Sequence, residues 1–173
     1  MNSSEKIDYI STWIKDYAHS ISKKPKNLVI GVSGGVDSAL TSTLCAHTGL
    51  KTIAVSMPIK QNSSQHDLSL RHLDFLKQNY SNVETQIVKL DHVFNIFQDT
   101  MQNFNSELAF ANSRSRLRMV TLYQIAQSNN GIVVGTGNKV EDFGVGFYTK
   151  YGDGGVDISP IADCTKSEVW ELA

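Results

Sequence analysis

Short apolar runs alternate along the chain with longer segments in which apolar residues recur every three or four positions. Runs of the first kind predict buried strands, and segments of the second kind predict helices that pack one face on a sheet. The predicted strands cover residues 28–32, 52–57, 83–88 and 131–135. Between and after them, helices are predicted over residues 39–47, 65–78, 91–102 and 112–128. A first helix, capped by Ser3 or Ser4, is predicted to end at the Lys23-Lys24-Pro25 run.

Strands that alternate with helices through short connections predict an α/β fold, a doubly wound parallel sheet with helices on both faces. Ligands of such sheets bind beyond the carboxyl ends of the strands. Two glycine-rich loops are expected at that edge, Gly31 to Ser38 and Gly135 to Asn138. We therefore expect the two loops to face one crevice, although they lie far apart in the sequence.

The first loop has the composition of a phosphate-binding loop. Its residues are Gly31-Val32-Ser33-Gly34-Gly35-Val36-Asp37-Ser38, and a helix follows directly. Adjacent glycines allow a ligand to approach the backbone, and the free N–H groups of a helix start attract an anion. A Walker loop would carry lysine directly before its last Ser or Thr, whereas this chain has Asp37 there. A carboxylate in that position predicts Mg²⁺ between the loop and the phosphates of ATP.

Composition narrows the class of protein further. With 173 residues, 40% of them hydrophobic, we expect one domain over residues 1–173. A net charge of -1 gives no basic field of the kind that nucleic-acid binding needs, so no nucleic acid is expected as a partner. Two cysteines cannot build a disulfide framework, and the amino terminus has no apolar signal, which together predict a reducing, cytoplasmic location. No apolar stretch approaches the roughly 20 residues of a membrane span.

The motifs resemble those of a known family. The Ser33–Ser38 hexapeptide matches the SGGxDS loop of the N-type ATP pyrophosphatases, which cleave ATP between the α- and β-phosphates. The sequence over 135–141 and the far more specific TKYGDGG run at 149–155 are similar to NAD synthetases, and Arg116-Leu117-Arg118-Met119 extends that likeness. The resemblance runs from about Asn27 to the last residue. It implies a Rossmann-like fold of the adenine nucleotide alpha hydrolase type.

The activity that the resemblance implies is the last step of NAD biosynthesis. In that reaction deamido-NAD⁺, ATP and ammonia give NAD⁺, AMP and pyrophosphate through an adenylated carboxylate. Besides the phosphate loop, Thr136 and Lys166 are implied to bind ATP, while Asp37 and Glu141 are implied to bind Mg²⁺. The residues implied to bind deamido-NAD⁺ are Arg116, Lys150 and Asp157. A homodimer is implied as well, with substrate sites at the subunit interface.

Simpler interpretations of these residues stay open. Apart from the resemblance, Glu141 is a solvated acid at a helix start, Lys166 a surface lysine, and 149–155 a mobile surface loop that could close over a ligand. For Arg114 and Arg118 a solvated helix face stays open. Two other functions also remain, namely another ATP pyrophosphatase of the GMP synthetase or tRNA-modifying type, and an inactive nucleotide-binding fragment. The chain lacks the basic excess or metal-binding cysteines expected of a tRNA ligase.

The end of the chain carries a helix start. Thr165-Lys166-Ser167-Glu168 is a capping box, so a helix should begin there with Val169, Trp170 and Leu172 on its apolar face. Because the sequence ends at Ala173, we expect that face to be half-partnered and the carboxy-terminal part of the family's domain to be missing, which puts activity of this chain in question. No glutamine-hydrolysing part is expected within the 173 residues. Free ammonia is therefore the implied nitrogen source.

Overall fold

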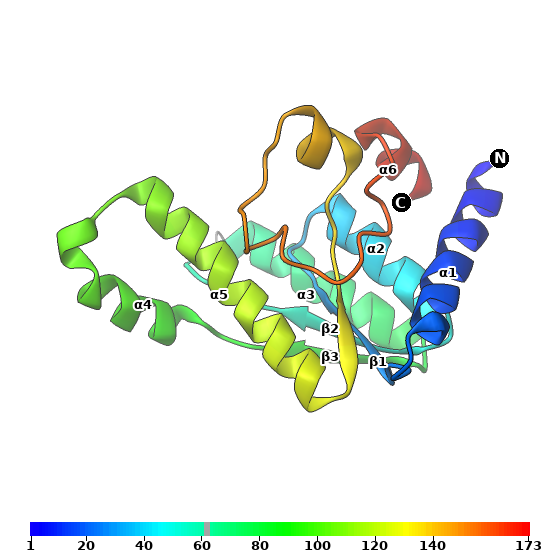
Figure 1. The fold of residues 1–173 in the computed structure, drawn as a ribbon, viewed down its shortest axis with the longest axis horizontal. Helices are drawn as coiled ribbons and strands as arrows, with labels where there is room; N and C mark the ends of the chain where they lie inside the picture. Colours follow the sequence, from blue (N-terminus) through cyan, green and yellow to red (C-terminus); the bar gives the residue numbers. More distant parts are fainter. Residues whose placement is uncertain (61–62) are drawn as a thin grey trace.

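The computed structural model describes residues 1–60 and 63–173, in which the chain folds around a parallel sheet (Figure 1). Four strands form this sheet in the order β3-β2-β1-β4. Their bounds are β1 Asn27–Gly31, β2 Lys51–Ser56, β3 Val83–Ile87 and β4 Gly131–Val134. In the register of the central strand, Val29 pairs with Ile53 on one side and with Val133 on the other. The predicted parallel sheet is confirmed.

Helices cover both faces of the sheet, as predicted for a doubly wound fold. Four pack on one face, namely α1 (Ser3–Ser20), α2 (Val36–His47), α3 (Ser63–Asn79) and α6 (Lys166–Leu172). The other face carries α4 (Asp91–Thr100) and α5 (Glu107–Ser128), with a short 3-10 turn, η1 (Gln102–Phe104), between them. Side chains of β1 alternate accordingly, because Leu28 and Ile30 join the first core and Val29 the second.

Four helices begin at residues that differ from the predicted ones, among them α3, which begins at Ser63 and not at residue 65. The cap of α1 is Asn2, not Ser3 or Ser4, because its side chain accepts from the backbone N–H of Glu5 at 2.9 Å in a capping box. The start of α5 lies five residues earlier than predicted, since the hydroxyl of Ser106 caps it. The start of α2 follows Gly35 directly, so that Asp37 and Ser38 belong to the first helical turn. Because α2 begins earlier than predicted, the Asp37 carboxylate lies in its first turn, near the carboxyl end of β1, where a ligand is expected.

The last helix, α6, begins with the predicted capping box at Thr165. The expectation that its apolar face is only half-partnered is wrong for two of the three residues. Val169 is fully buried and Leu172 is 7% exposed, and both pack in the core shared with α1 and α2. Only Trp170 of the three apolar residues points outward, with 66% of its surface exposed. In Figure 1 α6 lies close to α1, and Lys6 Nζ donates to Glu168 Oε1 across the pair at 2.9 Å.

No helix within 1–60 and 63–173 has both the length and the apolar character that a bilayer crossing requires.

Candidate functional site

The phosphate loop lies at the carboxyl end of β1, and hydrogen bonds to its own serine hydroxyls stabilise its conformation. The N–H of Ser33 donates to Ser38 Oγ at 3.1 Å, and Ser38 Oγ donates to the carbonyl of Gly35 at 2.9 Å. Gly34 has φ +92°, and a Cβ there would lie 2.5 Å from the backbone oxygen of Gln65 in α3. Glycine is therefore required at this position both by backbone conformation and by space. No side chain caps α2, so the amide end of the helix is left for an anion.

Two carboxylates converge on one ammonium group beside this loop. Lys166 Nζ donates to Asp37 Oδ2 and to Glu141 Oε1, the latter at 3.1 Å. Desolvation lowers the pKa of Lys166, but the hydrogen bonds to Asp37 and Glu141 and their charges outweigh it, so that the pKa is raised above its ordinary value. The three side chains come from the first turn of α2, from the π-helical turn η2 (Val140–Gly144) and from the start of α6. The structure thus brings together three predicted site residues that are distant in sequence.

A fourth side chain in this cluster, Asn138, was not among the predicted site residues. It is fully buried, and its Nδ2 donates to Asp37 Oδ1 at 2.8 Å. Its Oδ1 accepts from the backbone N–H groups of Val140 and Glu141, each at 3.1 Å. The only sequence signal for this residue was its place at the end of the second glycine-rich loop.

A cavity of about 610 Å³ lies next to the phosphate loop. The predicted ATP contacts Gly31, Val32, Ser33 and Thr136 contribute to its wall. The apolar part of the wall includes Met57, Ile59, Met119, Leu122, Val134, Phe147 and Val156. A wall that is apolar on one side and meets a phosphate loop on the other suits a nucleotide, whose base has flat faces that pack on apolar side chains and whose phosphates are charged.

Arginines from α5 also line this cavity, so a solvated face is the wrong interpretation for Arg114 and Arg118. Arg118 Nε donates to the carbonyl of Met57 at 3.0 Å, and burial followed by the charge of Arg114 lowers the pKa of Arg118. The guanidinium carbon of Arg114 lies 5.6 Å from the centroid of the Phe94 ring. Both positive charges therefore face a partly enclosed space in which an anionic ligand would be favoured.

The predicted loop over 149–155 has turns but no helix or strand, and it lies on α5. Asp153 Oδ1 accepts from Ser115 Oγ at 2.7 Å and from the N–H of Thr149 at 2.8 Å, while the N–H of Asp153 donates back to Ser115 at 2.9 Å. Arg116 Nε donates to the carbonyl of Lys150 at 3.1 Å, which brings these two predicted substrate contacts together. The side chain of Tyr151, the one large apolar side chain of this loop, is 67% exposed and does not anchor it. Polar contacts to α5 hold this loop instead.

The third predicted substrate contact, Asp157, lies apart from that pair along the edge of β4. Its Oδ2 accepts from the backbone N–H of Val133 at 2.7 Å, and its Oδ1 accepts from the hydroxyl of Tyr123 at 3.1 Å. Desolvation, with the charge and hydrogen bond of Asp157, raises the pKa of Tyr123 to about 12. Asp157 thus completes hydrogen bonding at the open edge of the sheet, and its role in binding substrate stays a prediction.

The carboxylates beside the phosphate loop suit a hard divalent cation. Asp37 and Glu141 already hold one positive charge between them, that of Lys166. Within the described part of the chain, no group of three or more His, Cys, Asp or Glu side chains lies close enough to hold a metal without other ligands. Mg²⁺ commonly takes one or two carboxylates and completes its shell with phosphate oxygens and water, so the residues present fit it.

Neither cysteine is placed for nucleophilic chemistry. Cys45 is fully buried in α2, and desolvation raises the pKa of its thiol to about 12. The pKa of Cys164 is raised too, chiefly by desolvation and then by the charge of Glu168. Because the reactive form of cysteine is the thiolate, both side chains are expected to be inert.

Comparisons with known proteins agree with this geometry. The model of the family described as NAD synthase matches residues 6–173. The NH(3)-dependent NAD(+) synthetase of Carboxydothermus hydrogenoformans is 35% identical over 178 residues, which cover 100% of this chain and 70% of that relative. The corresponding enzyme of Finegoldia magna is 32% identical, with 100% and 69% covered.

Solved structures are similar over the same length. The NMN synthetase of Francisella tularensis superposes with a TM-score of 0.89 at 34% identity, covering 99% of this chain and 69% of that one. The NH3-dependent NAD synthetase of Campylobacter jejuni, in complex with the nitrate ion, gives 0.88 at 30% identity, covering 100% and 72%. Since the family match and the identities extend over nearly all residues, the chain belongs to the NAD synthase family.

Proposed function

We propose that this protein amidates deamido-NAD⁺ with ammonia at the expense of ATP, giving NAD⁺, AMP and pyrophosphate through an adenylated carboxylate. The observation that carries this proposal is the convergence of Asp37, Glu141 and Lys166 beside a glycine-rich loop at the carboxyl end of β1. The family match and the names of the relatives support it. They favour it over a GMP synthetase or a tRNA-modifying ligase.

The chemistry requires activation of a poor acylating group. A carboxylate oxygen becomes a leaving group when it attacks the α-phosphate of ATP, with release of pyrophosphate. The uncapped amide end of α2 and the Lys166 ammonium are positioned to stabilise the negative charge that builds up on the departing phosphates. Ammonia then attacks the acyl carbon and AMP leaves. In this mechanism the protein chiefly orients its substrates and neutralises their charge.

Asp37 and Glu141 are the residues that we propose to hold Mg²⁺. When bound, the ion would neutralise phosphate charge and link the carboxylates to ATP. The ammonium of Lys166 lies between the two carboxylates, so we infer that Lys166 turns toward a phosphate oxygen when the metal binds. Thr136 lies in the cavity wall and is proposed to contact ATP.

Arg116, Lys150 and Asp157 are proposed to bind deamido-NAD⁺. Arg116 and Lys150 support this role because they lie side by side on α5 and its attached loop, and both are exposed. A planar guanidinium suits phosphate or ribose oxygens. Asp157 supports it less directly, since both of its oxygens already accept hydrogen bonds. For Asp157 to bind the substrate as well, its carboxylate oxygens must accept further hydrogen bonds through their second lone pairs.

A second substrate deserves a test because the structure with the TM-score of 0.89 is named an NMN synthetase. Such an enzyme amidates a mononucleotide, which lacks the adenylate half of deamido-NAD⁺. Both substrates present the same carboxylate to ATP, so the phosphate loop does not distinguish them. Relative kcat/KM for deamido-NAD⁺ and for nicotinate mononucleotide measures the preference, and we expect deamido-NAD⁺ to be the better substrate.

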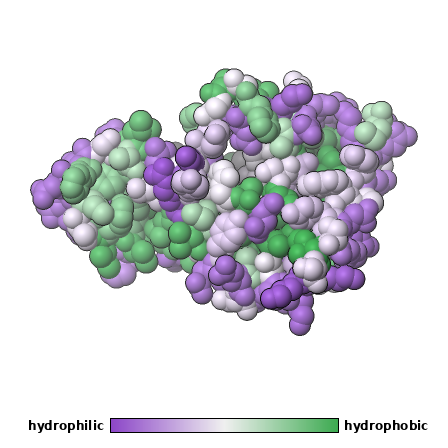
Figure 2. Space-filling view, in the orientation of Figure 1, coloured by the Kyte–Doolittle hydropathy of each residue, from purple (hydrophilic) through white to green (hydrophobic). Residues whose placement is uncertain are grey.

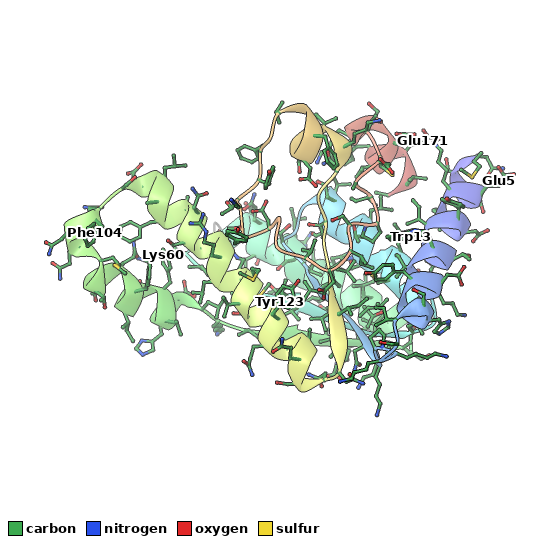
Figure 3. The ribbon with its side chains drawn as sticks, in the orientation of Figure 1. Glu5, Trp13, Lys60, Phe104, Tyr123 and Glu171 are labelled. Carbon is green, nitrogen blue, oxygen red and sulfur yellow. The ribbon has the colours of Figure 1, made fainter. Side chains whose placement is uncertain are left out.

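The partner of the protein is proposed to be a second copy of itself. Apolar side chains gather over the lobe formed by α4, η1 and the first turns of α5 (Figure 2), and Phe104 lies at its tip (Figure 3). The exposed apolar residues of this lobe are Val93, Ile96, Phe97, Phe104 and Leu108. Large exposed apolar patches are typical of interaction sites. Light scattering should give twice the mass of one chain. The double variant Phe104→Glu and Leu108→Glu should lower the measured mass to that of a single chain.

One assay tests the central proposal. NAD⁺ and AMP are measured after incubation with deamido-NAD⁺, ATP, Mg²⁺ and ammonium, with ammonium omitted as the control. Equal amounts of NAD⁺ and AMP that depend on ammonium support the proposal. ATP binding without AMP formation would favour the nucleotide-binding fragment.

The cytoplasmic location expected from the two free cysteines stays a prediction.

A further inference from the structure

Asn138, like Lys166, contacts both halves of the proposed metal site, but it does so from a fully buried position and as a neutral amide. It lies between β4 and η2 and has no exposed surface. On one side its amide nitrogen donates to Asp37 Oδ1 at 2.8 Å. On the other side its amide oxygen accepts the N–H groups of Val140 and Glu141, both at 3.1 Å. One buried amide therefore connects two loops whose residues are 101 positions apart.

The orientation of this amide follows from its partners. A carboxylate oxygen can only accept, and a backbone N–H can only donate. The amide nitrogen must consequently face Asp37, and the amide oxygen must face Val140 and Glu141. Asparagine is suited to this position because it offers both a donor and an acceptor over the length of one short side chain.

We propose that Asn138 is a positioning residue for the Mg²⁺·ATP site, an inference that rests on the function proposed above. By holding Oδ1 of Asp37, it leaves Oδ2 directed at the place where the Lys166 ammonium now lies. By holding the backbone N–H of Glu141, it fixes the turn from which the second carboxylate projects. It thereby sets the separation of the two carboxylates without touching the metal or ATP itself. Outer contacts of this kind orient metal ligands, and their loss typically costs about 10- to 100-fold in metal affinity.

The alternatives at this position explain why the amide matters. Aspartate would keep the two contacts to Val140 and Glu141 but would place a second carboxylate against Asp37 in a buried environment. Serine would leave a hydroxyl too short to reach both sides. An apolar residue would leave Asp37 Oδ1 and two backbone N–H groups without these partners.

The test measures the gain in ATP affinity that Mg²⁺ produces, by calorimetric titration with ATP in Mg²⁺ and in EDTA. The variants are Asn138→Ser and Asn138→Asp, and the matched controls are Asn82→Ser and Asn82→Asp. The side chain of Asn82 likewise ties distant backbone together, by donating to the carbonyls of Ala46 at 2.9 Å and Leu50 at 2.8 Å, but it has no contact with Asp37 or Glu141 among those described. Thermal midpoints are recorded for all four proteins.

We expect both Asn138 variants to reduce the Mg²⁺-dependent gain about 10- to 100-fold, and Asn138→Ser to keep its affinity in EDTA. The Asn82 variants should lower the thermal midpoint and keep the gain. The decision rests on Asn138→Ser, which adds neither bulk nor charge and is the variant more certain to fold. A gain equal to that of the wild-type protein, with only a lower midpoint, would make Asn138 merely structural and overturn the inference. A wild-type protein without any Mg²⁺-dependent gain would overturn the proposed function as well, so the two failures are distinguishable.

Discussion

The amide nitrogen of Asn138 lies 2.8 Å from Oδ1 of Asp37, and this contact joins the loop after β4 to the first turn of α2, the helix that follows β1. The two strands are neighbours in the sheet, so their carboxyl ends meet at one edge. The contact fixes one oxygen of Asp37 and leaves the other beside Lys166. The proposed metal site is therefore a property of the sheet topology rather than of one contiguous motif.

The Asp37→Asn variant should separate ligand binding from folding. An asparagine oxygen can still accept from Asn138, so the fold is expected to be retained. The loss of the carboxylate removes a proposed Mg²⁺ ligand and one of the two partners of Lys166. We expect AMP formation to be abolished and Mg²⁺·ATP affinity to fall, as measured by calorimetry with circular dichroism as the folding control. Unchanged Mg²⁺-dependent affinity in a folded variant would remove Asp37 from the metal site.

The sequence predicted the sheet chiefly because its central strands β1 and β2 are short apolar runs with both faces buried, as Leu28 and Val29 illustrate. It was less reliable at helix starts, where a single polar side chain decides. Asn2 and Ser106 cap helices, but in the sequence each is an ordinary polar residue among several that could cap. The burial of Leu172 also escaped prediction, since its partners belong to α1 and α2, far away in the chain.

The residues of the candidate site likewise divide into those that the sequence predicted and those that it did not. Residues within matched motifs, such as Asp37 and Glu141, could be named from the sequence, and the structure brings them together around Lys166. Residues that act through distant partners could not. Asn138 and Ser115 are ordinary polar residues in the sequence, and only tertiary contacts distinguish them.

Gly34→Ala should destabilise the protein and distort the phosphate loop. The residue has φ +92°, and the new Cβ would lie 2.5 Å from the Gln65 carbonyl oxygen, so both strain and collision contribute. Gly49→Ala is the matched control, because Gly49 has φ +75° but nothing within 4 Å of the added Cβ. We expect the control to lose about 1 to 2 kcal/mol from backbone strain. The Gly34 variant should lose more in urea unfolding, and equal losses would show that α3 moves aside without cost.

The contact between α1 and α6 should weaken in acid through Glu168. Its carboxylate accepts from the backbone N–H of Thr165 and then from Lys6, which lowers its pKa from 4.5 to about 2. A pKa that is depressed in the folded state stabilises the fold above the unfolded value and loses that effect as pH falls toward the folded value. The difference in unfolding free energy between the wild-type protein and Glu168→Gln should therefore be constant above about pH 5. It should shrink between pH 4.5 and about 2. A difference that stays constant down to pH 2 would contradict the assignment.

The loop over 149–155 should open when its contacts with α5 are removed. Ser115→Ala deletes the reciprocal hydrogen bonds with Asp153, at 2.7 and 2.9 Å. A net loss of about 1.4 kcal/mol, near the upper value for one hydrogen bond, would raise the open population about tenfold. Cleavage by trypsin after the exposed Lys150 tracks that population when opening is fast, so the rate should rise by about the same factor.

Ser128→Ala is the control for this experiment, because Ser128 lies at the carboxyl end of α5, where it accepts from Gln124 at 3.3 Å and, among the contacts that the structure describes, has none with the loop over 149–155. Its cleavage rate should equal that of the wild-type protein. If the loop closes over the dinucleotide, saturating deamido-NAD⁺ should slow cleavage after Lys150 in the wild-type protein and in both variants. It should do so most in Ser115→Ala, where more of the free protein is open. Equal cleavage with and without ligand would show that the loop is held on α5 for stability and does not act as a lid.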